Sequence, residues 1–75
     1  MIMFHIRVNT GDNDSTAIYY FVHKDYANLT DDEQQEAFDA AVKELNHVYH
    51  DYGRFATSVG VTRLFDKFGF ERTVP

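Results

Sequence analysis

Residues 30–52 read TDDEQQEAFDAAVKELNHVYHDY, and this stretch decides the fold. Apolar residues recur in it at intervals of three and four, which is the period of a helix with one buried face. We therefore expect one long amphipathic helix that packs on the rest of the domain. The apolar positions are Phe38, Ala41, Val42, Leu45, Val48, Tyr49 and Tyr52.

Residues at both ends of this segment indicate where the helix starts and stops. Thr30 and Glu33 have the spacing of a capping box, in which each side chain bonds to the backbone amide of the other residue. Acidic residues in the first turn complement the positive end of the helix dipole. Gly53 allows the left-handed backbone that ends many helices, so we predict a helix from about residue 31 to residue 52.

Two strands are predicted before the helix. Residues 2–9 alternate between apolar and polar side chains, which is typical of a half-buried strand. Residues 16–24 are rich in β-branched and aromatic side chains, and the turn-forming residues 11–15 separate the two segments. The sequence therefore predicts an antiparallel hairpin.

The C-terminal third has two interpretations. We favour a helix that begins near Ser58 and stops at Gly69, because its apolar residues fit helical spacing. Alternation between Phe55 and Val61 favours instead a short strand before a shorter helix. In both interpretations residues 70–74 form a last strand beside the hairpin, with Phe70 in contact with Phe65.

These elements predict an α+β fold of one domain, residues 1–75, with the order ββααβ or ββαβαβ. Either order gives a two-layer sandwich, with an antiparallel hairpin, a C-terminal strand and two helices on one face of the sheet. The sequence contains no repeat or linker that would divide it.

One short segment resembles a known family. Residues 64–71, LFDKFGFE, are similar to the late helix-to-strand segment of GNAT-type acetyltransferases. The glycine-rich loop with which that family holds the acetyl-CoA pyrophosphate has no counterpart in this sequence. The resemblance therefore implies only that a helix ends at Gly69 in this segment, and we infer no function from it.

Composition limits the function. The net charge is −5, and residues 1–51 hold ten acids against three bases, whereas residues 52–75 hold two acids against four bases. Such an acidic chain attracts basic proteins and repels nucleic acid. No cysteine is present, and no apolar run approaches the roughly 20 residues that span a bilayer. We expect a cytoplasmic protein that binds neither nucleic acid nor a membrane directly.

No pattern points to catalysis. The sequence has no cysteine, no Gly-x-Ser-x-Gly and no phosphate-binding glycine loop, so we expect neither an enzyme nor a cofactor. Glu44 and His47, with His50 and Asp51, form a candidate metal-binding cluster near one helix face. Dimetal bundles need two such Glu-x-x-His pairs, so a solvated helix end is the more ordinary interpretation. His5 and His23 are a second candidate pair across the hairpin.

The acidic residues carry the functional prediction. Asp32, Glu36 and Asp39 follow one another at i, i+4 and i+7, on the side of the helix away from its apolar face. Asp12 and Asp14 lie in the hairpin turn. A solubilising surface is the ordinary meaning of such charges. The functional interpretation is a surface that imitates nucleic-acid phosphates, anchored on its partner by Tyr19, Tyr20 or Tyr26.

The sequence thus predicts a small protein-binding module, an inhibitor or accessory factor that docks on the basic, nucleic-acid-binding surface of a larger complex. Small inhibitors from phages and other mobile elements, including anti-CRISPR proteins, share this general profile. A homodimeric structural or assembly protein, paired through a sheet edge or an apolar sheet face, is the alternative. A small metal-binding protein is a further one.

Overall fold

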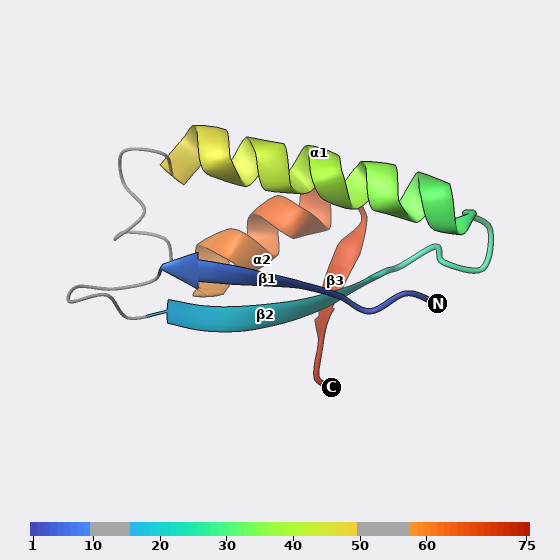
Figure 1. Cartoon of the computed structure of the whole chain (residues 1–75), viewed down its shortest axis with the longest axis horizontal. Helices are drawn as coiled ribbons and strands as arrows, with labels where there is room; N and C mark the ends of the chain where they lie inside the picture. The colour runs from blue at the N-terminus through green and yellow to red at the C-terminus, as the bar shows by residue number, and fades with distance from the viewer. Residues whose placement is uncertain (10–15, 50–57) are drawn as a thin grey trace.

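The computed structural model describes residues 1–9, 16–49 and 58–75. Its elements follow the order ββααβ, which confirms the predicted fold class (Figure 1). Helix α2 begins at Ser58 as predicted, and Val59 and Val61, which the alternative assigned to a strand, lie in this helix. The elements are β1 (Phe4–Asn9), β2 (Thr16–His23), α1 (Asp31–Tyr49), α2 (Ser58–Lys67) and β3 (Phe70–Thr73).

The three strands form one sheet in the order β1-β2-β3, and both pairs are antiparallel. Phe4 of β1 lies opposite Phe21 of β2, while His23 at the end of β2 lies opposite Phe70 of β3. Strand β2 is therefore central, and β1 and β3 are the edges. The predicted hairpin turn at residues 11–15 lies outside the described residues.

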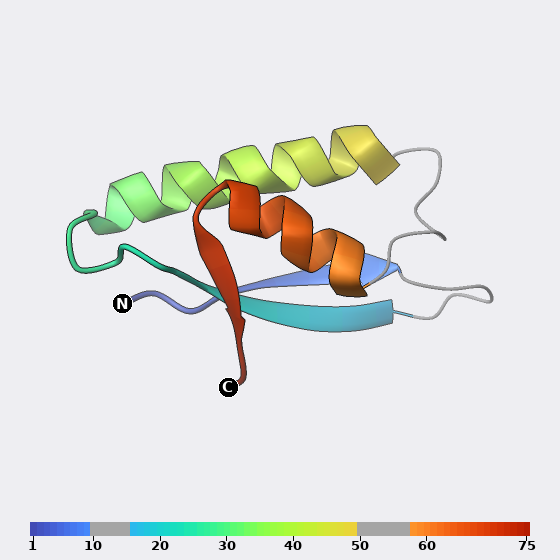
Figure 2. The same cartoon turned by 180° about the vertical axis from the view of Figure 1, so that it is seen from behind.

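Both helices pack on the same face of the sheet. The ring of Phe4 stacks on Phe38 of α1 with centroids 4.5 Å apart, and the ring of Phe21 stacks on Phe65 of α2 at 4.4 Å. Because register partners point to the same face, these two stacks place α1 and α2 in one layer above the strands. Figures 1 and 2 show the two helices from opposite sides.

The core contains an aromatic cluster to which every described helix and strand contributes one phenylalanine. Phe70 of β3 meets Phe4 edge to face at 5.7 Å and Phe38 at 5.6 Å. It also contacts Phe65 at 6.2 Å, the contact predicted from the sequence. Each such aromatic pair contributes about 0.5–1.5 kcal/mol beyond the apolar area it buries.

The capping box at the start of α1 is confirmed. The hydroxyl of Thr30 accepts a hydrogen bond from the Glu33 amide (3.1 Å), and Oε1 of Glu33 accepts one from the Thr30 amide (2.9 Å). The hydrogen bond from the Thr30 backbone, and then that with its side chain, lowers the pKa of Glu33 below 4.5. The first turn of α1 is therefore fixed by two reciprocal bonds.

The buried face of α1 differs from the apolar pattern at two positions. Phe38, Ala41 and Leu45 are buried as predicted, but Val48 is exposed because it lines a groove between α1 and α2 instead of entering the core. Gln34 is buried although it is polar, and its Nε2 donates to the Leu29 carbonyl at 3.1 Å. The side chains of Tyr49 and Tyr52 and the predicted stop at Gly53 lie outside the described residues.

Helix α2 ends at a left-handed glycine, as predicted. Gly69 has a φ of 89°, a conformation that residues with a Cβ rarely adopt. The amides of Phe68 and Gly69 donate to the carbonyls of Phe65 and Asp66, each at 3.0 Å, and close the last turn. The chain then reverses into β3 and brings Phe70 into the core.

Candidate functional site

The outer face of α1 is strongly acidic. Asp32, Glu36 and Asp39 are all exposed, and they lie on the side of the helix away from the buried positions. We call these three residues the acidic face. The whole helix holds six carboxylates and one lysine, a net charge of −5, and all six are exposed.

The acidic face lies in the first half of α1. Oδ1 of Asp39 accepts a hydrogen bond from Nε2 of Gln35 at 2.9 Å, which orients this carboxylate along the helix surface. Lys43 lies one turn after Asp39 and continues the same line with the opposite charge. The negative surface therefore weakens toward the C-terminal end of the helix.

The structure places the three predicted tyrosine anchors in three different environments. Tyr19 is only 6% exposed and belongs to the core cluster, with the guanidinium of Arg72 4.6 Å from its ring centroid. The ring therefore leaves little surface for a partner, and we no longer count Tyr19 among the anchors. The strand period explains this, since Tyr19 lies opposite Ile6 on the helix-covered face.

The other two tyrosines lie at opposite places on the molecule. Tyr20 alternates with Tyr19, so it points to the sheet face away from the helices, in a row with His5 and Thr73. Tyr26 is 45% exposed and lies in the turn that leads from β2 into α1. Only Tyr26 is thus close along the chain to the acidic face, and one flat partner surface cannot contact both Tyr20 and that face.

Several predicted residues lie outside the described part of the chain: Asp12, Asp14, His50 and Asp51. Glu44 and His47 are both exposed on α1, one turn apart. Within residues 1–9, 16–49 and 58–75, no three histidine or carboxylate side chains come together as a metal site would require.

His5 and His23 do not form a pair. His5 lies opposite Tyr20 on the open face of the sheet, whereas His23 points to the helix-covered face, where it is buried and meets the ring of Phe70 at 4.9 Å. Nδ1 of His23 accepts a hydrogen bond from the Asp25 amide at 3.0 Å. Its imidazole is therefore a packed part of the turn after β2.

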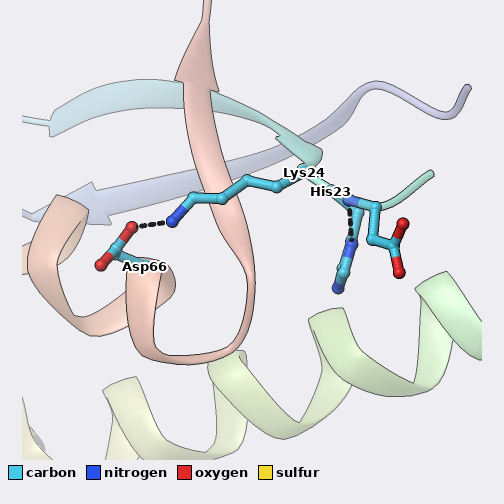
Figure 3. A network of polar contacts seen from close by, with 4 residues as sticks. His23, Lys24 and Asp66 are labelled. Carbon is cyan, nitrogen blue, oxygen red and sulfur yellow. Dashed lines mark hydrogen bonds and ion pairs between the residues drawn. The ribbon is translucent and has the colours of Figure 1, made fainter.

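The residue after His23 joins β2 to the C-terminal half. Lys24 forms an ion pair with Asp66 near the end of α2 (Figure 3). The Lys24 amide also donates to the Gly69 carbonyl at 2.8 Å. Both side chains of the ion pair are largely exposed, so the pair adds little stability beside the backbone hydrogen bond between Lys24 and Gly69.

A groove of about 580 Å³ lies between α1 and the edge strand β1, and no pattern in the sequence predicts it. It depends on the position of α1 over the sheet, which no local pattern encodes. Alternation in residues 2–9 indicated a strand but not that this strand lies at the edge. The groove is lined by His5, Ile6, Arg7, Ile18, Gln35, Phe38, Asp39 and Val42.

Comparisons with known proteins add no relative to this description. Among the described residues, no helix has the length and apolar character needed to cross a membrane. A scan against protein-family models found no match, and searches of curated proteins and of solved structures found no significant similarity.

Proposed function

We propose that this protein is a small binding module whose acidic face docks on a basic, nucleic-acid-binding surface of a larger complex. It acts there as an inhibitor or accessory factor, by binding and not by catalysis. The observation that carries the proposal is the exposed line of Asp32, Glu36 and Asp39 on a helix of net charge −5.

Charge density supports this proposal. A helix rises about 1.5 Å per residue, so the three carboxylates of the acidic face cover about 10 Å, with one charge every 5 Å or so. One strand of duplex DNA carries a phosphate about every 3.4 Å along the axis. A surface that binds phosphates with lysines and arginines thus meets a comparable line of negative charge on α1.

The rigidity of α1 also favours docking. The capping box fixes the first turn, and Phe38, Ala41 and Leu45 anchor the opposite side of the helix in the core. Carboxylates held on such a support lose little backbone freedom on binding, which lowers the free-energy cost of association. Tyr26, in the turn before α1, is the aromatic side chain placed to contact the same partner.

In type, such a module corresponds to the small inhibitors that phages and mobile elements direct at nucleic-acid-associated complexes, including anti-CRISPR proteins. Those inhibitors act inside the cell, and a chain without cysteine fits the reducing cytoplasm. Both assignments are parts of the proposal and depend on the identity of the partner.

The test is an affinity capture from host lysate with the wild-type protein and with the triple variant Asp32→Asn, Glu36→Gln, Asp39→Asn. Partners identified by mass spectrometry should be released by moderate salt, because exposed charges are screened within about 10 Å at 0.1 M salt. With a purified partner, the triple variant should associate more slowly and lose salt dependence.

A matched control separates the acidic face from net charge. The variant Glu44→Gln, Asp66→Asn, Glu71→Gln changes the charge equally but leaves the acidic face intact. It should keep most of the association rate. Equal binding by the wild type and by the triple variant of the acidic face would show that the proposal is wrong.

A further inference from the structure

Strand β1 has a free edge. It lies at the end of the order β1-β2-β3, and within residues 1–9, 16–49 and 58–75 no strand pairs with its outer side. Its six residues contain no proline, and their register with β2 is uninterrupted from Phe4 to Asn9. Such an edge presents a row of backbone donors and acceptors on which another strand can pair.

The groove between β1 and α1 follows this edge. Ile6 points to the helix-covered face of the sheet, whereas His5 and Arg7 point to the open face. All three side chains line the same groove, so the groove passes over the edge of β1 from one face to the other. Gln35, Asp39 and Val42 of α1 form its upper wall. An extended segment laid along β1 would fill this space.

The charges in the groove select the side chains of such a segment. Asp39 lies on the α1 side, and its only described hydrogen-bond donor is Gln35. Arg7 lies on the strand side and forms no ion pair with a described residue. Because successive side chains of a strand alternate, an added strand turns one set toward Asp39 and the other toward Arg7. Basic residues fit the first set and apolar or acidic residues the second.

A second copy of this chain fits the groove poorly. Antiparallel pairing of two β1 edges about a two-fold axis would bring two α1 helices to the same side of the joined sheet. Each helix has a net charge of −5, and Asp39 lies on the flank that would face the axis. Like charges in such positions oppose association. A basic segment from another protein meets attraction at the same place.

We propose that the groove between β1 and α1 receives a basic, extended segment of the partner protein, which adds to the sheet as a strand paired with β1. This inference rests on the proposed function, since it assigns the binding mode to the same basic partner. Pairing with β1 adds backbone hydrogen bonds to the attraction between opposite charges. Asp39 belongs both to the acidic face and to the lining of the groove.

The experiment uses the full chain and a probe peptide, acetyl-Lys-Val-Lys-Val-Lys-Val-Lys-Val-amide. Two further versions carry N-methyl groups on all valine amides or on all lysine amides. In a strand these two sets of amides point to opposite edges, so one version should bind at least about tenfold more weakly than the other. On binding, hydrogen exchange measured by NMR should slow at alternate amides of β1, between Phe4 and Asn9.

Two charge variants locate the peptide. Asp39→Lys, in the groove, should abolish binding, whereas Glu44→Lys, on the other flank of α1 and outside the groove, should weaken it only through net charge. If both weaken binding equally, and β1 amides stay unprotected, strand addition is wrong while the acidic-surface proposal stands.

The remaining outcomes are also decisive. If the peptide fails to bind at low salt, the proposed strand addition and the proposed preference for basic partners are both wrong. Light scattering across a dilution series tests the second copy: a dimer whose β1 amides are protected without peptide would show that this chain fills its own groove.

Discussion

The imidazole of His23 lies directly against Gly69. A Cβ built on Gly69 would be 2.6 Å from Nε2 and 2.9 Å from Cε1 of His23, closer than any side chain tolerates. The same glycine has a φ of 89° and accepts a hydrogen bond from the Lys24 amide. The end of β2 therefore packs closely against the turn from α2 to β3, and the contact leaves no room for a side chain at Gly69.

Replacing this glycine should be costly. In Gly69→Ala the new methyl group collides with the ring, and the residue must also keep a left-handed backbone, which alone costs about 1–2 kcal/mol. We expect the free energy of unfolding, measured by urea denaturation, to fall by about 2 kcal/mol or more. A loss below about 0.5 kcal/mol would contradict the packing described here.

A double-mutant cycle separates the two causes. In a His23→Ala background the collision is gone, so Gly69→Ala should cost only the backbone term there. Equal costs in both backgrounds would mean that the ring and the glycine do not interact.

The capping box makes stability depend on pH in a defined window. The folded state lowers the pKa of Glu33 below 4.5, so its contribution is complete above that pH and disappears as the pH falls through the lowered value. The difference in unfolding free energy between the wild type and Glu33→Gln should therefore shrink as the pH falls from above 4.5 through the lowered pKa of Glu33. Glu36→Gln, which removes an exposed carboxylate outside the capping box, is the control.

Gln34 offers a test of a buried amide. It is 1% exposed, and its Oε1 has no hydrogen-bond partner among the described residues, while its Nε2 bonds to Leu29. In Gln34→Glu a charged carboxylate would face the Leu29 carbonyl without a donor, whereas a protonated carboxyl could donate to it. Burial should raise the pKa of the new group.

The variant should consequently be strongly destabilised at pH 7 and recover as the pH falls through the raised value. Urea midpoints at pH 7 and pH 5 measure the recovery. Gln35→Glu makes the same chemical change on the exposed side of α1. This variant should be little destabilised at pH 7, and its urea midpoint should recover little at pH 5. Equal behaviour of the two variants would argue against the burial of Gln34.

Phe65 tests the aromatic cluster. A buried Phe→Ala change costs about 3–5 kcal/mol, and a chain of 75 residues has a total stability of about 4–11 kcal/mol. Phe65→Ala should therefore lose a large share of its free energy of unfolding and melt at a much lower temperature than the wild type, as measured by circular dichroism. Phe65→Leu should stay folded with a lower melting temperature, and the exposed Tyr26→Ala should melt close to the wild type. A normal melting curve for Phe65→Ala would contradict its central place.

Sequence patterns were sufficient where a structure depends on neighbours in the chain. The capping box of Thr30 and Glu33, the start of α2 at Ser58 and the stop at Gly69 each follow from a few adjacent residues, and all three are present. The last strand beside the hairpin was also predicted, and in the structure β3 pairs antiparallel with β2 and buries Phe70.

Sequence patterns were not sufficient where the burial of a side chain depends on how the helices pack on the sheet. The run from Ala17 to Val22 is apolar on both faces, so alternation could not say whether Tyr19 or Tyr20 enters the core. Gln34 is buried by its position above the sheet although its side chain is polar. The groove beside β1 needed both the strand order and the path of α1, neither of which a local period contains.

The aromatic cluster also determines when this chain can fold during synthesis. Phe4, near the beginning, packs against Phe38 and Phe70, and Phe70 belongs to the last strand described. Until residue 70 has left the ribosome, the hairpin and α1 lack the ring that completes their packing. Folding should therefore wait for the C-terminal strand and then occur in one cooperative step, so that a nascent chain truncated before Phe70 remains a target for proteases.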